Sequence, residues 1–280
     1  IGFSLHKQHT NPENMEKFLE SSVSFKHMYS VSKPKKCEKK QPRPFTTSTL
    51  QQAASNELSY SPKKTMQAAQ KLYEAGHITY MRTDSRVYSA EFIKNCVLFI
   101  KDKYGQPFVL GNIRSLSQRQ KKDNAQEAHE AIRPTDINRD HVNLNNRLYE
   151  LIRRNTLQSC MMPAEFEYIV AKITAPEDTH YRYRAEKPVF LGWKIVGTIS
   201  TDDREYQDLR TKKPCKVKYS KIYSKYALKE LKTHYTEAKL VQFLEKKGIG
   251  RPSTFASLIS KIQDREFVIK TDVEGKKIEC

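Results

Sequence analysis

Start and stop signals for two helices enclose a short connection that contains the sequence Ile-Thr-Tyr-Met-Arg-Thr-Asp-Ser. The first predicted helix, Ser61 to Ala75, has a proline in its first turn and is followed by a glycine, the usual chemistry of a helix start and stop. The second begins near Ser89, a good N-cap, and runs to Tyr104. Tyr80 therefore lies between two helices, where its phenol can be presented rather than buried.

The residues that follow Tyr80 carry complementary polar groups. Arg82 supplies a fixed cation, Asp84 a carboxylate, and Thr83 and Ser85 two hydroxyls. A nearby cation stabilises phenolate, and a guanidinium grips a phosphate through two parallel hydrogen bonds. This composition is compatible with a covalent phosphotyrosyl step, but a half-buried ring beside a surface cation has the same sequence.

Two more segments have helical patterns. Phe45 to Leu58 begins with a cluster of N-cap residues and continues with good helix formers. Asn145 to Cys160 is amphipathic, with leucines and an isoleucine predicted to face inward and Arg153 and Arg154 outward.

The chain then changes in character. Segments 165–174, 180–184, 189–199 and 217–226 are rich in β-branched and aromatic residues and predict antiparallel strands. Ser32 to Pro44, rich in Lys and Pro, is predicted to be a solvated connection, and residues 1–32 are too weakly patterned to assign. Helices and antiparallel strands together predict the α+β class.

The last part of the chain contains a glycine-rich turn between two predicted helices. The first helix begins after Thr236 and ends at Lys247, and the second starts at Ser253 or Thr254. A helix N-terminus preceded by glycines and Arg251 is suited to bind a phosphate, although a plain helix–turn–helix connection fits equally well. Residues 267–279 predict a hairpin around Glu274-Gly275.

Charge points to a polyanionic partner. The chain has 280 residues and a formal net charge of +18, and it has no apolar stretch long enough to span a bilayer. Nucleic acid is therefore favoured over an anionic membrane. The five cysteines form no CxxC pair, which favours free thiols in a reducing compartment over a zinc ribbon or a disulfide framework.

Four stretches, in the same order, resemble the motifs of type IA DNA topoisomerases, with the tyrosine stretch in the form of the bacterial topoisomerase I branch. They cover much of the chain: PFTTSTLQQAA (44–54), ITYMRTDS (78–85), QEAHEAIRPT (126–135) and YTEAKLVQFLEKKGIGRPSTFASLISKIQDR (235–265). The resemblance implies a helical tyrosine domain inserted in an antiparallel β arch, followed by the start of a helical DNA-binding domain. The corresponding domains are 1–44, the first part of the arch and a linker; 45–163, the tyrosine domain; 164–234, the returning arch; and 235–280, part of the single-strand DNA-binding domain.

The resemblance also implies roles for individual residues. Tyr80 would be the nucleophile, and Arg82 would stabilise the charge that develops on the phosphate. Phosphate positioning would fall to His129 and Arg133, together with Thr83 and Asp84. Single-strand DNA contacts would come from the last turn: Lys247, Arg251, Ser253 and Thr254. Phe255 stands where the family commonly has Tyr, which puts a hydrogen bond at that position in doubt.

The family reaction is ATP-independent relaxation of negatively supercoiled DNA through a 5′-phosphotyrosyl intermediate, with Mg²⁺. No acidic pair that could hold Mg²⁺ precedes the first motif. We therefore expect a partial chain that lacks the N-terminal metal-binding (Toprim) domain and the C-terminal end, contains no metal ligands, and is inactive by itself. Alternatives are a non-catalytic single-strand DNA-binding module or the topoisomerase part of a reverse gyrase.

The expected partners are single-stranded DNA and negatively supercoiled duplex DNA, with no membrane. We expect a monomer that forms part of a longer polypeptide, in the cytoplasm, at the nucleoid or in another DNA-containing compartment.

Overall fold

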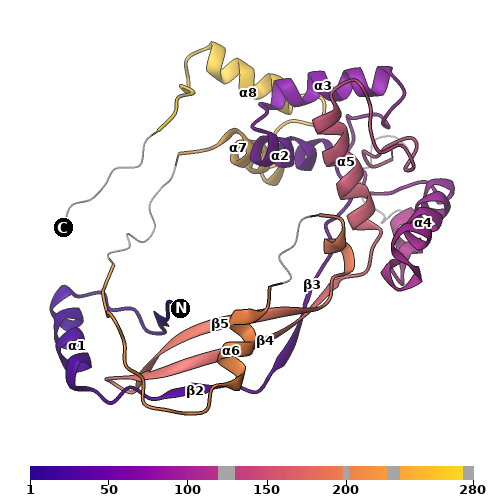
Figure 1. The fold of residues 1–280 in the computed structure, drawn as a ribbon. Coiled ribbons are helices and arrows are strands. Elements are labelled where there is room, and N and C mark those ends of the chain that lie inside the picture. The colour runs from indigo at the N-terminus through magenta and orange to yellow at the C-terminus, as the bar shows by residue number, and fades with distance from the viewer. Residues whose placement is uncertain (119–129, 198–201, 226–233, 274–280) are drawn as a thin grey trace. The chain divides into compact units, whose positions relative to one another are not determined.

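The computed structural model describes residues 1–118, 130–197, 202–225 and 234–273 (Figure 1). The chain forms two compact units, each built from two segments. One unit comprises Ile1–Lys40 and Pro163–Lys232, and the other comprises Gln41–Met162 and Thr233–Cys280. Helices and an antiparallel sheet confirm the predicted α+β class. The finer division into four domains stays a prediction.

The first unit is built on a five-stranded antiparallel sheet with the order β1-β5-β4-β2, in which β3 also pairs with β4. Its centre is the long hairpin of β4 and β5, whose pairing runs from Glu165 opposite Phe190 to Ala175 opposite Thr179. The strands are β1 (Ser4–Leu5), β2 (Tyr29–Val31), β3 (Lys35–Lys39), β4 (Ala164–Ala175) and β5 (Thr179–Phe190).

One face of this sheet is covered by helix α6 (Arg204–Thr211), which lies in front of β4 and β5 in Figure 1. Tyr206 and Leu209 of α6 pack with Ile169 and Ala185 of the sheet. The Tyr206 hydroxyl also donates to Glu167, and burial together with this bond raises the pKa of Tyr206 to about 12. The helix therefore buries one sheet face.

Two of the predicted strands are wrong in most of their described residues. In the segment predicted at 189–199, Val189 and Phe190 end β5, residues 191–197 form no strand, and Gly192–Ile195 is a 3₁₀ turn (η3) that begins at a positive φ of 49°. Residues 217–225, the described part of the last predicted strand, form no strand. Its first residue, Val217, donates its amide to the His27 carbonyl at 2.9 Å and packs against the core under α6, next to an isolated bridge between Met28 and Lys216.

Several elements of the first unit are absent from the sequence prediction, and β1, β2 and α6 are among them. Helix α1 (Pro12–Ser24), capped by Asn11, lies in the stretch that was left unassigned. Strand β3 lies in the Lys- and Pro-rich segment expected to be a solvated connection. Its backbone pairs with β4 from Lys35 opposite Tyr168 to Lys39 opposite Ala164, because ladder hydrogen bonds do not require apolar side chains.

The second unit contains the predicted helices, and their capping residues are confirmed. Thr46, Ser61, Ser89 and Thr236 each accept a hydrogen bond from the first turn of the helix that follows. The helices are α2 (Thr47–Leu58), α3 (Pro62–Glu74), α4 (Ala90–Tyr104), α5 (Asn146–Ser159), α7 (Glu237–Lys246) and α8 (Phe255–Asp264), with 3₁₀ turns η1 (Gln106–Phe108) and η2 (Ile113–Ser117).

Two further predictions in this unit concern the direction of Arg153 and a hairpin near the end of the chain. Arg153 does not point outward: its Nε donates to the Ile137 carbonyl at 3.0 Å and its guanidinium lies 5.2 Å from the centre of the Phe99 ring. The hairpin turn predicted at Glu274-Gly275 lies outside the described residues, and residues 267–273 form no strand.

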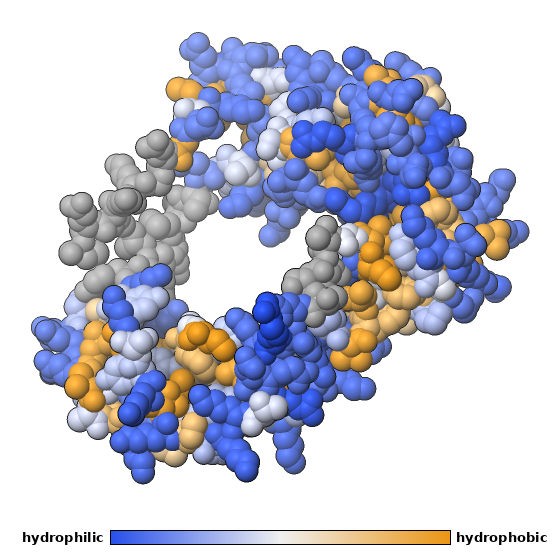
Figure 2. Space-filling model, viewed as in Figure 1, coloured by the Kyte–Doolittle hydropathy of each residue, from blue (hydrophilic) through white to orange (hydrophobic). Residues whose placement is uncertain are grey.

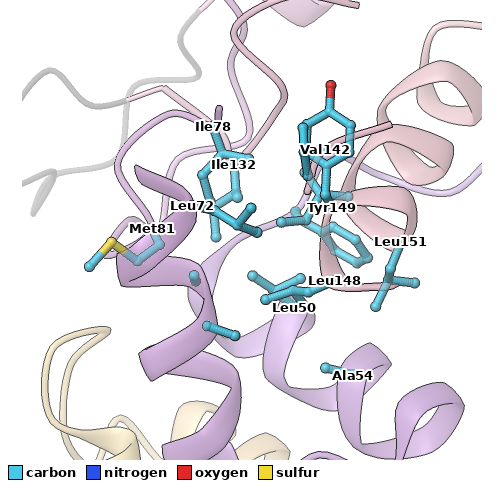
Figure 3. Close-up of a cluster of buried hydrophobic side chains, with 14 residues drawn as sticks. Leu50, Ala54, Leu72, Ile78, Met81, Ile132, Val142, Leu148, Tyr149 and Leu151 are labelled. Carbon is cyan, nitrogen blue, oxygen red and sulfur yellow. The ribbon is translucent and has the colours of Figure 1, made fainter. Parts of the chain in front are cut away.

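The core of the second unit joins three helices to the connection that carries Tyr80 (Figure 3). Leu50 of α2, Leu72 of α3 and Leu148 of α5 are completely buried and pack with Ile78 and Met81 of the connection. The position of the connection is therefore tied to the packing of the helices.

The face of the molecule seen in Figure 2 is mostly hydrophilic, with small scattered hydrophobic areas. Among the described residues, no helix is both long enough and apolar enough to cross a membrane. Cys37, Cys96, Cys160 and Cys215 are free thiols, as the sequence predicts, and Cys280 lies outside the described residues.

We predict that Leu72→Ala lowers the free energy of unfolding by about 2–5 kcal/mol, because it leaves a cavity in this core. Leu98→Ala is the matched control, since Leu98 is also helical but 64% exposed, and it should change stability by about 0.5 kcal/mol or less. Urea denaturation measures both. Equal losses in the two variants would contradict this account of the core.

Candidate functional site

The tyrosine loop, Ile78–Ser85, is held along one side by residues 131–135. The Thr79 amide donates to the Arg133 carbonyl at 2.9 Å, and the Arg133 amide donates back to Thr79 Oγ1 at 3.0 Å. Thr79 Oγ1 also donates to the Ala131 carbonyl at 2.8 Å, and Ile78 forms an isolated bridge with Pro134. Segments 52 residues apart in sequence are thus joined directly beside Tyr80.

Thr47, the first residue of α2, holds the other end of the loop. Its amide donates to the Thr83 carbonyl at 2.9 Å, and its hydroxyl donates to the Met81 carbonyl at 2.7 Å. The Thr83 amide in turn donates to Thr47 Oγ1 at 2.9 Å. Thr47, Met81 and Thr83 are all buried, whereas Arg82 between them is exposed. This alternation directs the guanidinium of Arg82 outward.

Tyr80 itself is half-buried and packs against the core cluster of the helices. Its ring meets the Tyr73 ring of α3 edge to face, with centroids 5.3 Å apart and an interplanar angle of 66°. The side chain is therefore supported by packing on α3, and is less fully presented than the sequence suggested.

Thr83 and Asp84, both predicted to position a phosphate, differ in their surroundings. Thr83 is buried, and its Oγ1 accepts a hydrogen bond from the Ser85 amide at 3.0 Å. Asp84 is exposed. Thr83 thus shapes the loop from inside, and Asp84 lies on the same outer side as Arg82.

Arg133 is close to the loop but is already engaged by α4 and its own segment. Its Nε donates to Glu130 Oε2 at 2.7 Å, and Nη2 donates to Ser89 Oγ at 3.4 Å. The guanidinium lies 4.1 Å from the centre of the Phe92 ring, and the side chain is only 11% exposed. His129, its predicted partner, lies outside the described residues.

Arg86 is a cation of this region that sequence reasoning missed. Its Nη1 donates to the Pro44 carbonyl at 2.8 Å, which ties the end of the connection to the start of α2. Burial lowers the pKa of Arg86, Glu245 opposes that change, and Arg43 adds to it. A guanidinium stays protonated, so Arg86 adds fixed positive charge near the loop. The only sequence signal for it was its place in the same connection.

The turn between α7 and α8 carries the other predicted contacts. Lys247, Arg251 and Ser253 are exposed, and Thr254 Oγ1 accepts from the Arg251 amide at 2.8 Å, which fixes the turn. Gly250 is required there, because its φ is 83° and an added Cβ would lie 2.7 Å from Leu258 Cδ1.

The two helices beside this turn belong to the same unit as the tyrosine loop. Helix α7 packs on α2 and helix α8 packs on α3. The turn is therefore anchored to the same helices that support Thr47 and Tyr80.

The described side chains near the loop include few metal-binding groups. Across the part of the chain that the structure describes, no three His, Cys, Asp or Glu side chains come together in a way that could hold a metal ion. The chemical groups available near the loop are thus a supported phenol, an exposed guanidinium and buried or half-buried cations.

Comparison with known proteins gives one consistent result. A family model described as DNA topoisomerase matches residues 3–278. DNA topoisomerase 1 of Pseudomonas aeruginosa is 43% identical over 232 residues, which cover 80% of this chain and 26% of that protein. DNA topoisomerase 1 of Escherichia coli is 38% identical over 270 residues, which cover 92% of this chain and 30% of that protein.

A solved structure agrees with these relatives. The full-length topoisomerase I of Thermotoga maritima matches with a TM-score of 0.69 and 26% sequence identity, over 96% of this chain and 45% of that one. The chain spans less than a third of the length of the two curated relatives from Pseudomonas aeruginosa and Escherichia coli.

We predict that Thr47→Val lowers the free energy of unfolding by about 1–3 kcal/mol, because the buried Thr83 amide loses its acceptor. Hydrogen exchange at the Thr83 amide should become faster. Thr65→Val is the matched control: Thr65 is equally buried, but its hydroxyl donates only to the Ser61 carbonyl one turn earlier. Similar losses in both variants, with unchanged exchange at Thr83, would contradict the proposed role of Thr47.

Proposed function

The chain belongs to the type IA DNA topoisomerase family, and from this premise we propose that it carries the tyrosine that cuts one DNA strand. The observation that carries the proposal is the construction of the tyrosine loop. Backbone and side-chain hydrogen bonds fix it on both sides of Tyr80, while Arg82 stays exposed two residues further on. Such preorganisation is what a phosphoryl transfer requires of a protein.

In the proposed reaction, the phenol oxygen of Tyr80 attacks a phosphorus of the DNA backbone and loses its proton. The bond from phosphorus to the 3′ oxygen breaks, and that oxygen takes up a proton. The products are a 5′-phosphotyrosyl link and a free 3′-hydroxyl. Because one phosphate ester replaces another, resealing after strand passage needs no ATP, and relaxation of negatively supercoiled DNA can follow.

Arg82 is proposed to stabilise the charge that builds up on the phosphate oxygens. Two observations support this role: its guanidinium is exposed, and the residues on both sides of it are buried. An oriented cation near developing negative charge lowers the barrier because it needs little reorganisation during the reaction.

Phosphate positioning is proposed for His129, Arg133, Thr83 and Asp84. Arg133 is supported by its backbone pairing with Thr79, which keeps it next to the tyrosine. To bind a phosphate, its guanidinium would have to give up its hydrogen bond to Glu130 or to Ser89 and donate to the DNA instead. Thr83, being buried, would act through the shape of the loop.

Single-stranded DNA is the proposed ligand of Lys247, Arg251, Ser253 and Thr254. We also propose that the chain works as part of a longer, monomeric polypeptide that acts on negatively supercoiled DNA. Mg²⁺ is proposed as the cofactor of the whole polypeptide, and the described residues of this chain do not form a site for it.

We predict that Tyr80→Phe abolishes a covalent protein–DNA adduct in the whole polypeptide that contains this chain. The protein is incubated with a single-stranded oligonucleotide, denatured and digested, and the adduct is mapped by mass spectrometry. An oligonucleotide labelled at its 3′ end should transfer the label to Tyr80, whereas a 5′ label should remain on released DNA.

Tyr73→Phe is the matched control, because it removes a hydroxyl from the neighbouring ring and should leave the adduct intact. An adduct on another residue, or one that carries the 5′ label, would overturn the assignment of Tyr80.

We further predict that Arg82→Ala slows cleavage roughly 100- to 1,000-fold, because it removes one oriented group from the developing charge. Single-turnover cleavage of a labelled oligonucleotide at saturating protein measures this rate. Arg147→Ala, at an exposed arginine of α5, is the control for loss of charge and should cleave at the normal rate. An unchanged rate for Arg82→Ala would remove Arg82 from the mechanism.

A further inference from the structure

The two faces of the β-sheet carry different side chains. One face packs under α6, with Ile169, Ala171 and Ala185 in the core. Successive residues of a strand point to opposite faces of the sheet, and residues paired directly across two strands point to the same face. The register therefore identifies the residues on the face opposite α6. We call it the cationic face; its charged and aromatic members are Lys35, Lys39, Phe166, Tyr168, Lys172, His180, Arg182, Arg184 and Glu186.

Charge on this face is unbalanced. Its carboxylate, Glu186, is bound at 2.5 Å by Lys39 and at 2.8 Å by Arg184. Lys35, Lys172 and Arg182 are exposed, and none of them has a carboxylate partner within the described ranges of the chain. Three cations on three adjacent strands therefore remain available.

The potential of the cationic face is also reflected in His180. Burial lowers the pKa of His180, and the positive charges of Lys172, His6 and Arg182 lower it further. Lys172 and Arg182 are direct partners in the β4–β5 ladder. Lys172 and Arg182 thus lie close enough to act on the same point, as a polyanion would require.

The aromatic rings of this face indicate which form of nucleic acid would fit. The Arg184 guanidinium lies 3.7 Å from the centre of the Tyr168 ring, and Lys39 Nζ lies 4.1 Å from the centre of the Phe166 ring. A cation therefore already covers one face of each ring. Sequence-independent binding of single strands uses rings on which bases stack, whereas binding of a duplex backbone requires only cations. Covered rings beside exposed cations therefore fit a duplex better than a single strand.

We propose that the cationic face binds the phosphate backbone of duplex DNA through Lys35, Lys172 and Arg182. The identity of the ligand as DNA rests on the proposed function, but the contact itself needs no cleavage. Same-face residues recur about every 7 Å along a strand, so Lys172 and Tyr168, which pairs with Lys35, are about 13 Å apart along β4. The three cations therefore form a band across β3, β4 and β5.

The test compares two triple variants of the chain with equal loss of charge. K35Q/K172Q/R182Q removes the three free cations of the face. K213Q/K216Q/K218Q removes three exposed lysines of the segment whose Cys215 and Val217 pack into the core on the opposite face. Affinity for a duplex oligonucleotide is measured by fluorescence anisotropy over a range of salt concentrations, and circular dichroism verifies that both variants fold.

Loss of three phosphate contacts should reduce the slope of log Kd against log salt by about 2 to 3 for the cationic-face variant. The control variant should change it by less than about 1. Equal changes in both variants, or no change in the first, would overturn the proposal. An equal loss in binding of a single-stranded oligonucleotide would also overturn it, since that result would indicate a single-strand site.

Tyr80→Phe separates this proposal from the proposed function. It should leave the salt dependence of duplex binding unchanged even though no covalent adduct forms. Failure of the adduct experiment with a normal result for the triple variants would therefore refute only the catalytic assignment.

Discussion

The structure of the tyrosine loop depends on hydrogen bonds between three segments that are distant in sequence. Thr47 binds the loop at Met81 and Thr83, and the segment around Arg133 binds it at Thr79. Each buried amide or carbonyl that lacked its partner would cost about 1–3 kcal/mol, so the three segments stabilise one another. The loop has no regular secondary structure, yet hydrogen bonds hold its backbone at Thr79, Met81 and Thr83.

This constraint decides which side chains are available for chemistry. Met81 and Thr83 are buried and their backbone groups pair with Thr47, and Arg82 and Asp84, which alternate with them, are exposed. The outward guanidinium is thus a consequence of packing rather than of its own interactions. The hydrophobic cluster below the loop adds the remaining support, since Met81 lies in it together with Leu50 and Leu72.

The first unit is stabilised differently on the two faces of its sheet. Helix α6 buries one face of the long hairpin of β4 and β5, and the other face must be protected from aggregation. The opposite face is protected by charge, with Arg184 and Lys39 shielding its rings and Glu186 holding both cations in place. Such a face is soluble without a partner and is still able to bind one.

Local signals in the sequence determined the helices on either side of Tyr80, because Ser61, Ser89 and Gly76 act within one turn of their own position, whereas α1 and α6 were not predicted. They also determined that Tyr80 lies in a connection beside an arginine. Tertiary structure alone decided that Thr47 anchors the loop, that Lys35–Lys39 is a strand and that segment 217–225 is not. These outcomes depend on which distant backbone groups remain to be paired, and no local pattern records that.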